Sequence, residues 1–162
     1  ARWFHRDTAG WQPAPESIAV TGTTSCLSPD GSAAMLLGQR PTVLDHTGRG
    51  QPVTDLELAG ACALGAGGGI VADLFQTAGG TRSDIRVFDA AHAITWRRDV
   101  PGEALLSAHG TRVVYTSGNQ AHELDLRTGA ELRAVPAVRA ARYDRTGALV
   151  VVDAEGHPRW LD

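Results

Sequence analysis

The segment VVYTSGNQAHELDLRTGAEL, residues 113–132, decides the fold of this chain. It begins with an apolar run from Val113 to Tyr115, turns through polar residues, and returns through a second run that ends at Asp125. Thr128 and Gly129 follow as a second turn signal. Short apolar runs separated by polar, glycine-containing turns are typical of β-strands. We therefore predict two strands, a tight turn between them and a turn centred on the Asp.

Two landmarks of this segment recur along the whole chain, and internal repeats of this length define repeat architectures. The first is a turn-forming cluster that ends in a glycine, at Gly31, Gly67, Gly110 and Gly147. The second is an Asp after an apolar residue, at Asp45, Asp89, Asp125 and Asp162, and Asp7, which follows Arg6, lies 38 residues before Asp45. Successive glycines are 36, 43 and 37 residues apart, and successive Asp residues from Asp45 are 44, 36 and 37 apart. Both series lengthen in the same unit, so one local insertion explains the difference.

Strand patterns fill each repeat. A short apolar run follows each glycine landmark, at residues 33–37, 70–75, 113–115 and 149–152. Before Asp89 the chain alternates through residues 85–88, as a half-exposed strand does. No stretch sustains a helical period over three turns, and Gly and Pro interrupt the chain at strand spacing. The fold class that these patterns predict is all-β.

The segment 113–132 resembles a repeat of the quinoprotein-dehydrogenase-like (PQQ-like) β-propellers. In that family a strand leads to an Asp-x-x-Thr-Gly turn and then to an aromatic residue about seven positions past the Asp. Trp96 lies at that offset from Asp89, whereas the residue at the same offset from Asp125 is Leu132. The turn at residues 28–31 is similar to that of WD40 and TolB-like blades, but the Trp-Asp and Gly-His pairs of strict WD40 repeats are absent. The resemblance implies four-stranded antiparallel blades, about four in number or part of a larger propeller.

The spacing divides residues 1–162, a single β-propeller domain or fragment, into units. We expect a partial blade at 1–15, blades at about 17–56, 57–101 and 102–135, and a partial blade at 136–162. The small residues 59–64 suit an innermost strand beside a central channel. A β-sandwich or an open β-solenoid are alternative architectures with many short strands, but neither explains why two landmarks keep the same spacing.

Composition excludes several classes of function. The formal net charge is −3 and no basic stripe is present, so we expect no nucleic-acid partner. No apolar run approaches the roughly 18 residues of a membrane helix, so we expect no membrane insertion. All fifteen basic residues are Arg, which rules out a P-loop lysine, a Schiff base and a lysine general base.

No cluster of residues indicates catalysis, a cofactor or a metal. The glycines at residues 65–69 fail the G-x-G-x-x-G spacing, and the six histidines form no paired ligand motif. We therefore predict no catalytic, cofactor-binding or metal-binding residue. Cys26 and Cys62 occupy equivalent positions in neighbouring repeats, and we interpret them as buried free thiols rather than a disulfide. The tryptophans, Trp3, Trp11, Trp96 and Trp160, are interpreted as core residues, with Trp96 packing between blades.

The repeated Asp residues have a structural interpretation. An Asp side chain can accept hydrogen bonds from the following backbone, and a glycine supplies the positive φ that closes the turn. We assign Asp45, Asp89 and Asp125 to structural turns, together with the glycines that end the first turns, Gly31, Gly110 and Gly147.

The insertion marks the expected binding face. It falls between Phe75 and Ile85 and is predicted to form a polar, glycine-rich loop, since long irregular loops in compact repeats are often functional. The candidate partner-binding residues on this side are Arg40, Arg82, Asp84, Asn119 and Gln120. Their expected partner is another protein, as a separate domain or chain, or an acidic group.

Two classes of function remain open. The first is a non-enzymatic recognition or scaffold module that binds a protein partner through its loop faces. The second is a sensor or enzyme fragment of a larger quinoprotein-like propeller, although the adjacent Cys-Cys pair of that family is missing. An assembly-factor-like role is compatible with the resemblance as well.

Overall fold

The computed structural model describes residues 4–7, 10–13, 25–37, 40–45, 47, 49–56 and 59–161. Every regular element within these ranges is a β-strand, which confirms the all-β prediction. The described part of the chain contains no helix with the length and apolarity needed to cross a bilayer.

The strands form antiparallel sheets in which neighbours along the chain are neighbours in space. The N-terminal hairpin pairs β1 (Phe4–Asp7) with β2 (Gly10–Pro13). Sheet one consists of β3 (Ser25–Leu27), β4 (Ala33–Leu36), β5 (Thr42–Asp45) and β6 (Gly50–Pro52). Sheet two consists of β7 (Ala61–Gly65), β8 (Gly68–Thr77), β9 (Gly80–Asp89) and β10 (Ile94–Pro101). Sheet three consists of β11 (Leu105–His109), β12 (Arg112–Ser117), β13 (Gln120–Asp125) and β14 (Glu131–Pro136), and sheet four of β15 (Val138–Tyr143), β16 (Leu149–Asp153) and β17 (Pro158–Leu161).

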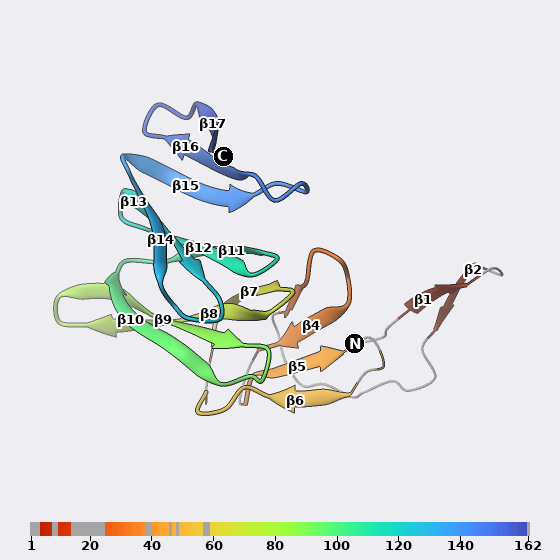
Figure 1. Ribbon diagram of the computed structural model, residues 1–162. Helices are drawn as coiled ribbons and strands as arrows, with labels where there is room; N and C mark the ends of the chain where they lie inside the picture. Colours follow the sequence, from red (N-terminus) through yellow and green to blue (C-terminus); the bar gives the residue numbers. More distant parts are fainter. Residues whose placement is uncertain are drawn as a thin grey trace.

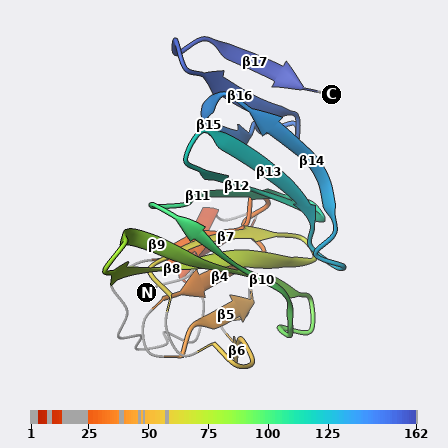
Figure 2. The same ribbon diagram turned by 90° about the vertical axis from the view of Figure 1, so that its left-hand side faces the viewer.

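Sheets one to four are stacked face to face in chain order (Figures 1 and 2). Their first strands lie side by side, because β7 contacts both β3 and β11, and β11 contacts β15. Small residues permit this approach: the backbone N–H of Ala66 donates to the carbonyl of Gly110 at 2.7 Å, and a Cβ on Gly65 would collide with that carbonyl. The first strands therefore form the inner edge of the stack.

Apolar side chains from facing sheets form the core. Met35 of sheet one packs with Val71 and Phe88 of sheet two. The opposite face of sheet two contributes Ile70 and Val87 to a cluster with Val113 and Tyr115 of sheet three. Val114 on the other face of sheet three packs against Val138 and Val151 of sheet four. Sheets two and three are thus buried on both faces.

Trp96 packs between sheets two and three, as the sequence predicted. Its ring lies 5.8 Å from that of Tyr115, centroid to centroid. A Cβ on Gly129, in the β13–β14 turn, would collide with the Trp96 side chain, so this position requires glycine for space as well as for its φ of 68°. The prediction that Trp160 lies in the core is wrong, since this residue is 61% exposed. The side chains of Trp3 and Trp11 lie outside the described residues.

A buried carboxylate joins sheets three and four. Glu123 of β13 is 2% exposed, and its oxygens pair with Arg112 Nη1 at 3.2 Å and Arg133 Nε at 3.1 Å. Tyr143 of β15 donates its hydroxyl to Glu123 Oε1 at 2.8 Å. Burial, and then the hydrogen bond to Glu123, raises the pKa of Tyr143, so this phenol remains a neutral donor. Removing one member of such a cluster would leave a buried charge unpaired.

The insertion forms an extended β-hairpin, not an irregular loop. Strands β8 and β9 are ten residues each and stay in register from Gly68↔Asp89 to Thr77↔Gly80. The prediction of a glycine-rich loop between Phe75 and Ile85 is therefore wrong, except at the two-residue turn that joins the strands. Extra length in both strands extends the hairpin beyond the other turns on that side (Figure 1).

Cys26 and Cys62 form a disulfide, so the prediction of two free thiols is also wrong. The two residues occupy the first strands of sheets one and two, β3 and β7, which lie in contact. Their Cα atoms are 5.9 Å apart, within the range that a disulfide spans. The bond therefore ties the two sheets together at the inner edge of the stack.

We expect the disulfide to contribute about 3–4 kcal/mol to the free energy of unfolding, because it closes a loop between residues 36 positions apart. Reduction should lower the midpoint of thermal unfolding by roughly 10 °C, measured by circular dichroism. The double variant Cys26→Ser/Cys62→Ser is the control and should not respond to the reductant. Two titratable thiols in the unreduced, unfolded protein would contradict the assignment.

Asp carboxylates close turns throughout the stack. Oδ1 of Asp45 and of Asp89 accepts hydrogen bonds from the backbone N–H groups two and four residues further on. Asp144 and Asp153, which sequence analysis did not single out, do the same. At Asp125 the donors are the backbone N–H and the hydroxyl of Thr128, both at 2.8 Å. These side chains are engaged with their own turns.

The turn bonds have a consequence for stability. Hydrogen bonds donated by Thr128 lower the pKa of Asp125. The ionised carboxylate therefore stabilises the fold at pH values above the ordinary pKa of an Asp, and this stabilisation is lost as the pH falls through the lowered pKa. We expect Asp125→Ala to cost about 1 kcal/mol at neutral pH and less in acid. Urea unfolding of both proteins at neutral pH and near pH 2 measures this. An equal cost at both pH values would show that the carboxylate charge does not matter.

Candidate partner-binding surfaces

The turns of the stack lie on two opposite sides. The second turn of each sheet joins its second and third strands, and these turns gather on the left-hand side of Figure 1. We call this side the second-turn face. It includes Arg40 in the β4–β5 connection, the tip of the β8–β9 hairpin, the β12–β13 turn at 117–120 and the β16–β17 turn. The first and third turns, with Asp45, Asp89 and Asp125, lie on the other side.

A cleft of about 260 Å³ opens on the second-turn face between sheets two and three. Arg98, Asp99 and Pro101 of β10 line one wall, and the β12–β13 turn lines the other. Asn119 and Gln120, two of the predicted partner-binding residues, belong to this second wall and are exposed. The cleft therefore presents amide groups opposite a guanidinium and a carboxylate.

Aromatic rings form the base of the cleft. Tyr115 is fully buried and stacks on His122, with centroids 4.9 Å apart. Arg98 Nη1 donates to the Tyr115 hydroxyl at 3.3 Å, while His122 Nδ1 lies 2.7 Å from Glu131 Oε2. Burial raises the pKa of Tyr115, so the phenol remains protonated at neutral pH. Stacked rings and fixed partners make this base rigid.

The β12–β13 turn is held from both sides. Ser117 Oγ donates to the carbonyl of Pro101 at 2.7 Å, across the cleft. The carbonyl of Asn119 accepts from the backbone N–H of Val138, at the start of sheet four, at 3.0 Å. Gly118 has a φ of 60°, which a residue with a side chain rarely adopts. The side chains of Asn119 and Gln120 are thus presented from a fixed backbone.

The other predicted binding residues have different surroundings. Arg82 lies in β9 and its Nε approaches Oδ2 of Asp99, on the cleft wall, at 3.4 Å. Arg40 is exposed in the β4–β5 connection and does not line this cleft. Asp84 does not lie in a surface loop as expected: it is 7% exposed in β9, and Arg86 and Arg97 bind its carboxylate at 2.6 and 2.9 Å. Asp84 therefore neutralises neighbouring guanidinium groups.

First turns from all four sheets meet around a second hollow of about 300 Å³, on the opposite side of the stack. Its lining residues are Pro29, Asp30, Ala66, His109, Gly110 and Arg145. Hydrogen bonds from Ser28 and Ser32 lower the pKa of Asp30 to about 2, so this carboxylate is ionised at neutral pH. Sequence reasoning missed the hollow, although its residues stand at or beside the repeated glycine turns.

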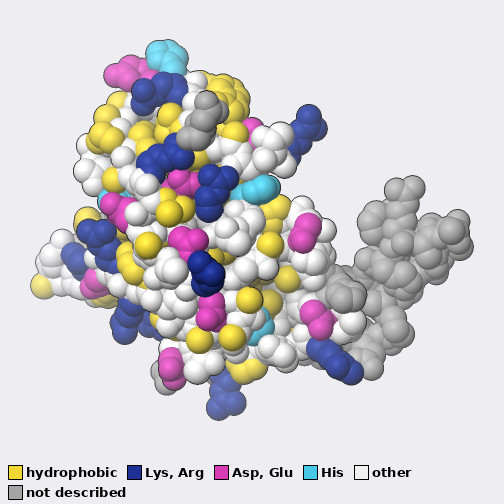
Figure 3. All heavy atoms as spheres, viewed as in Figure 1, with side chains coloured by type: hydrophobic (Ala, Val, Ile, Leu, Met, Phe, Trp, Pro, Cys, Tyr) yellow, Lys and Arg dark blue, Asp and Glu magenta, His cyan; other side chains and the backbone are white. Residues whose placement is uncertain are grey.

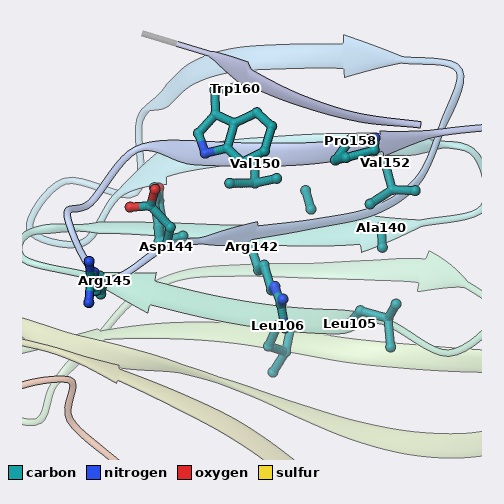
Figure 4. Close-up of a pocket in the computed structure, with 12 residues that line it drawn as sticks. Leu105, Leu106, Ala140, Arg142, Asp144, Arg145, Val150, Val152, Pro158 and Trp160 are labelled. Carbon is teal, nitrogen blue, oxygen red and sulfur yellow. The ribbon is translucent and has the colours of Figure 1, made fainter. Parts of the chain in front are cut away.

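A groove of about 850 Å³ covers the outer face of sheet four (Figure 4). Val150, Val152 and Trp160 line it together with Leu105, which is 47% exposed. The corresponding face of the second strand in sheet three carries Val114 and Thr116, both 3% exposed or less under sheet four. We therefore interpret the groove as a surface of the kind that another sheet covers within the stack, rather than as a ligand pocket.

Charges on the visible surface are mixed. Arg side chains alternate with Asp and Glu on the face seen in Figure 3, without a continuous basic area. Among the described residues no group of three or more His, Cys, Asp or Glu side chains could hold a metal ion.

Solved structures share this arrangement of sheets. BamB from Moraxella catarrhalis is 18% identical over 85% of this chain and 45% of its own, with a TM-score of 0.55. Hsv2 from Kluyveromyces marxianus is 15% identical over 90% of this chain and 48% of its own, with a TM-score of 0.54. A eukaryotic initiation factor is 11% identical over 99% of this chain and 48% of its own, with a TM-score of 0.61.

These likenesses show the fold: the stack consists of β-propeller blades, as the repeat predicted, in an open or partial propeller. The chain spans about half the length of each of the three propellers. No protein-family model matches the sequence, and no curated protein matches it. At these identities the comparisons indicate the fold and not the partner.

Proposed function

We propose that this chain is a non-enzymatic recognition module that binds a protein partner through its second-turn face. The observation that carries the proposal is the cleft between sheets two and three, where Arg98, Asn119 and Gln120 surround a rigid aromatic base. Binding sites are commonly formed by turns on a rigid scaffold with a few directed polar groups.

The chemistry of the cleft favours an acidic or amide-bearing group of the partner. A guanidinium donates to carboxylate oxygens in a planar, paired geometry, and the two amides both donate and accept. Arg82 and Arg40 add positive charge on the same side of the molecule, although Arg82 is partly neutralised by Asp99. We propose that Arg82 contributes to steering an acidic segment towards the cleft and that Arg40 contacts the same partner.

The alternative is a sensor or enzyme fragment of a larger quinoprotein-like propeller, and an assembly-factor-like role is a form of the recognition function. A bound quinone absorbs visible light, so the absorbance spectrum of the protein purified from its source separates the enzyme from the recognition module. We expect no visible band. A stoichiometric band would overturn the proposal.

The recognition function is tested by matched variants of two opposite faces. A partner captured by the immobilised protein is identified, purified and titrated against the wild type, Arg98→Ala and Asn119→Ala/Gln120→Ala by calorimetry. We expect each variant to bind at least about tenfold more weakly, as for central polar anchors of an interface, with little change in the midpoint of unfolding.

Arg127→Ala is the control for this experiment. Arg127 is also exposed but lies in the third turn of sheet three, on the opposite side of the stack. The Arg127→Ala variant should bind the partner as tightly as the wild type does. A partner that tolerates both cleft variants and loses affinity with Arg127→Ala would place binding on the other side of the propeller.

A further inference from the structure

The extended hairpin leaves one edge of sheet two without a strand. Strand β7 begins opposite Ala72, at the pair Ala61↔Ala72, whereas β8 continues for five more residues to Thr77. On its other side β8 remains paired with β9 to the end of the hairpin, and β10 follows β9 as far as Pro101↔Arg82. Residues 73–77 of β8 therefore form an edge that no described strand covers.

Backbone alternation identifies which groups face this edge. The carbonyl of Ala72 accepts from the N–H of Gly60, on the β7 side. In an antiparallel sheet the N–H and C=O of one residue point to the same side, and successive residues alternate. The backbone groups of Leu74 and Gln76 thus point to the free edge, while those of Asp73, Phe75 and Thr77 point to β9.

Beyond Asp73, at its end nearest to β7, the free edge lacks the features that prevent strands from pairing with it. Exposed edge strands are commonly protected by charges, prolines or bulges. The opposite edge of the same sheet has such protection, with Arg97, Arg98 and Asp99 in succession and Pro101 at the end of the strand. Residues 74–77 are Leu, Phe, Gln and Thr, with no charge, and their pairing with β9 contains no bulge. The first of them, Leu74, is 49% exposed.

We propose that the free edge of β8, residues 73–77, binds an extended segment of a partner protein by β-strand addition. This inference rests on the proposed recognition function, because the hairpin tip belongs to the second-turn face, and it names the kind of segment that this face receives. An added antiparallel strand continues the line of β7 and pairs with the backbone of Leu74 and Gln76.

Side chains on the edge define the chemistry of the segment. Leu74 points to one face of the sheet and Phe75 to the other, so apolar or β-branched residues opposite them gain contact on both faces. Asp73 has no ion pair among the described residues and marks the end of the free edge nearest to β7. A basic residue opposite Asp73 would pair with it. The segment is therefore extended, apolar at adjacent positions and basic near its C-terminal end.

A defined probe tests this proposal without the natural partner. The probe is an acetylated, amidated pentapeptide, Thr-Thr-Ile-Val-Arg, in which Arg lies opposite Asp73 in the antiparallel register and no residue extends past it to Ala72, which is already paired with β7. Its control carries Glu in place of Arg. Titration into the full chain is followed by NMR, and we expect the Leu74 and Gln76 amides to shift and to become protected from exchange. The Glu peptide should bind about fivefold more weakly, since like charges oppose pairing.

Proline variants separate the edge from the hairpin itself. Leu74→Pro removes an N–H that points to the free edge, so it should abolish peptide binding and leave the β8–β9 pairing intact. Phe75→Pro removes an N–H that bonds to β9, and it should disrupt the hairpin. If the peptide shifts no edge amide, or if Leu74→Pro binds it as the wild type does, strand addition is wrong.

Failure of the strand-addition proposal is distinguishable from failure of the recognition function. The cleft variants at Arg98, Asn119 and Gln120 leave the β8 edge intact and should bind the probe normally. If the cleft binds its partner but the edge does not bind the peptide, only the strand-addition proposal is wrong. Peptide-independent dimers that protect the same amides would identify a second copy of the chain as the occupant and overturn a partner segment.

Discussion

Sheets with apolar side chains on both faces need a neighbour on both sides, and the rest of this structure depends on that constraint. Val71 points towards sheet one and Ile70 towards sheet three, and both are 1% exposed or less. Burial of such side chains stabilises by about 25 cal/mol per Å² of apolar area. A pair of sheets could bury only one face of each, so the chain repeats its unit and stacks further copies.

Stacking determines where polar groups can lie. At the inner edge β7 and β11 approach so closely that a Cβ on Gly65 would collide with the carbonyl of Gly110, and the contact of β3 with β7 brings Cys26 and Cys62 within disulfide distance. Between sheets three and four the buried carboxylate of Glu123 is balanced by Arg112, Arg133 and Tyr143. At the turns some side chains, such as those of Asn119 and Gln120 on the second-turn face, are exposed rather than packed between sheets. The cleft and the β8 edge both lie among these turns.

The repeat, the all-β class and the packing position of Trp96 were predictable, because all depend on spacing along the chain. The disulfide was not, since equivalence in the repeat does not tell how closely two inner strands approach. The hairpin extension was interpreted as a loop because Gly79, Gly80 and Thr81 suggest a turn, whereas strand pairing extends almost to the tip. Asp84 was expected on the surface because it falls within the segment interpreted as a loop.

The cleft was half predictable. Asn119 and Gln120 follow from the position of the second turn, but Tyr115, His122 and Arg98 come from three strands whose proximity only the fold creates. Asp144 precedes Thr146 and Gly147 with the spacing seen after Asp45, so this missed turn residue carried a readable signal. Charge patterning could not reveal the burial of Asp84 or Glu123, because an alternating strand looks alike whether its polar face meets water or another sheet.

Residue-resolved amide hydrogen exchange tests most directly whether the stability of each sheet comes from covered faces. Strands β12 and β16 are matched, since both are second strands with a hydrogen-bonded neighbour on each side. Sheet three is covered on both faces and sheet four on one among the described residues. We predict that the amides of β16 exchange at least about tenfold faster than those of β12. Equal protection of the two strands would contradict the account.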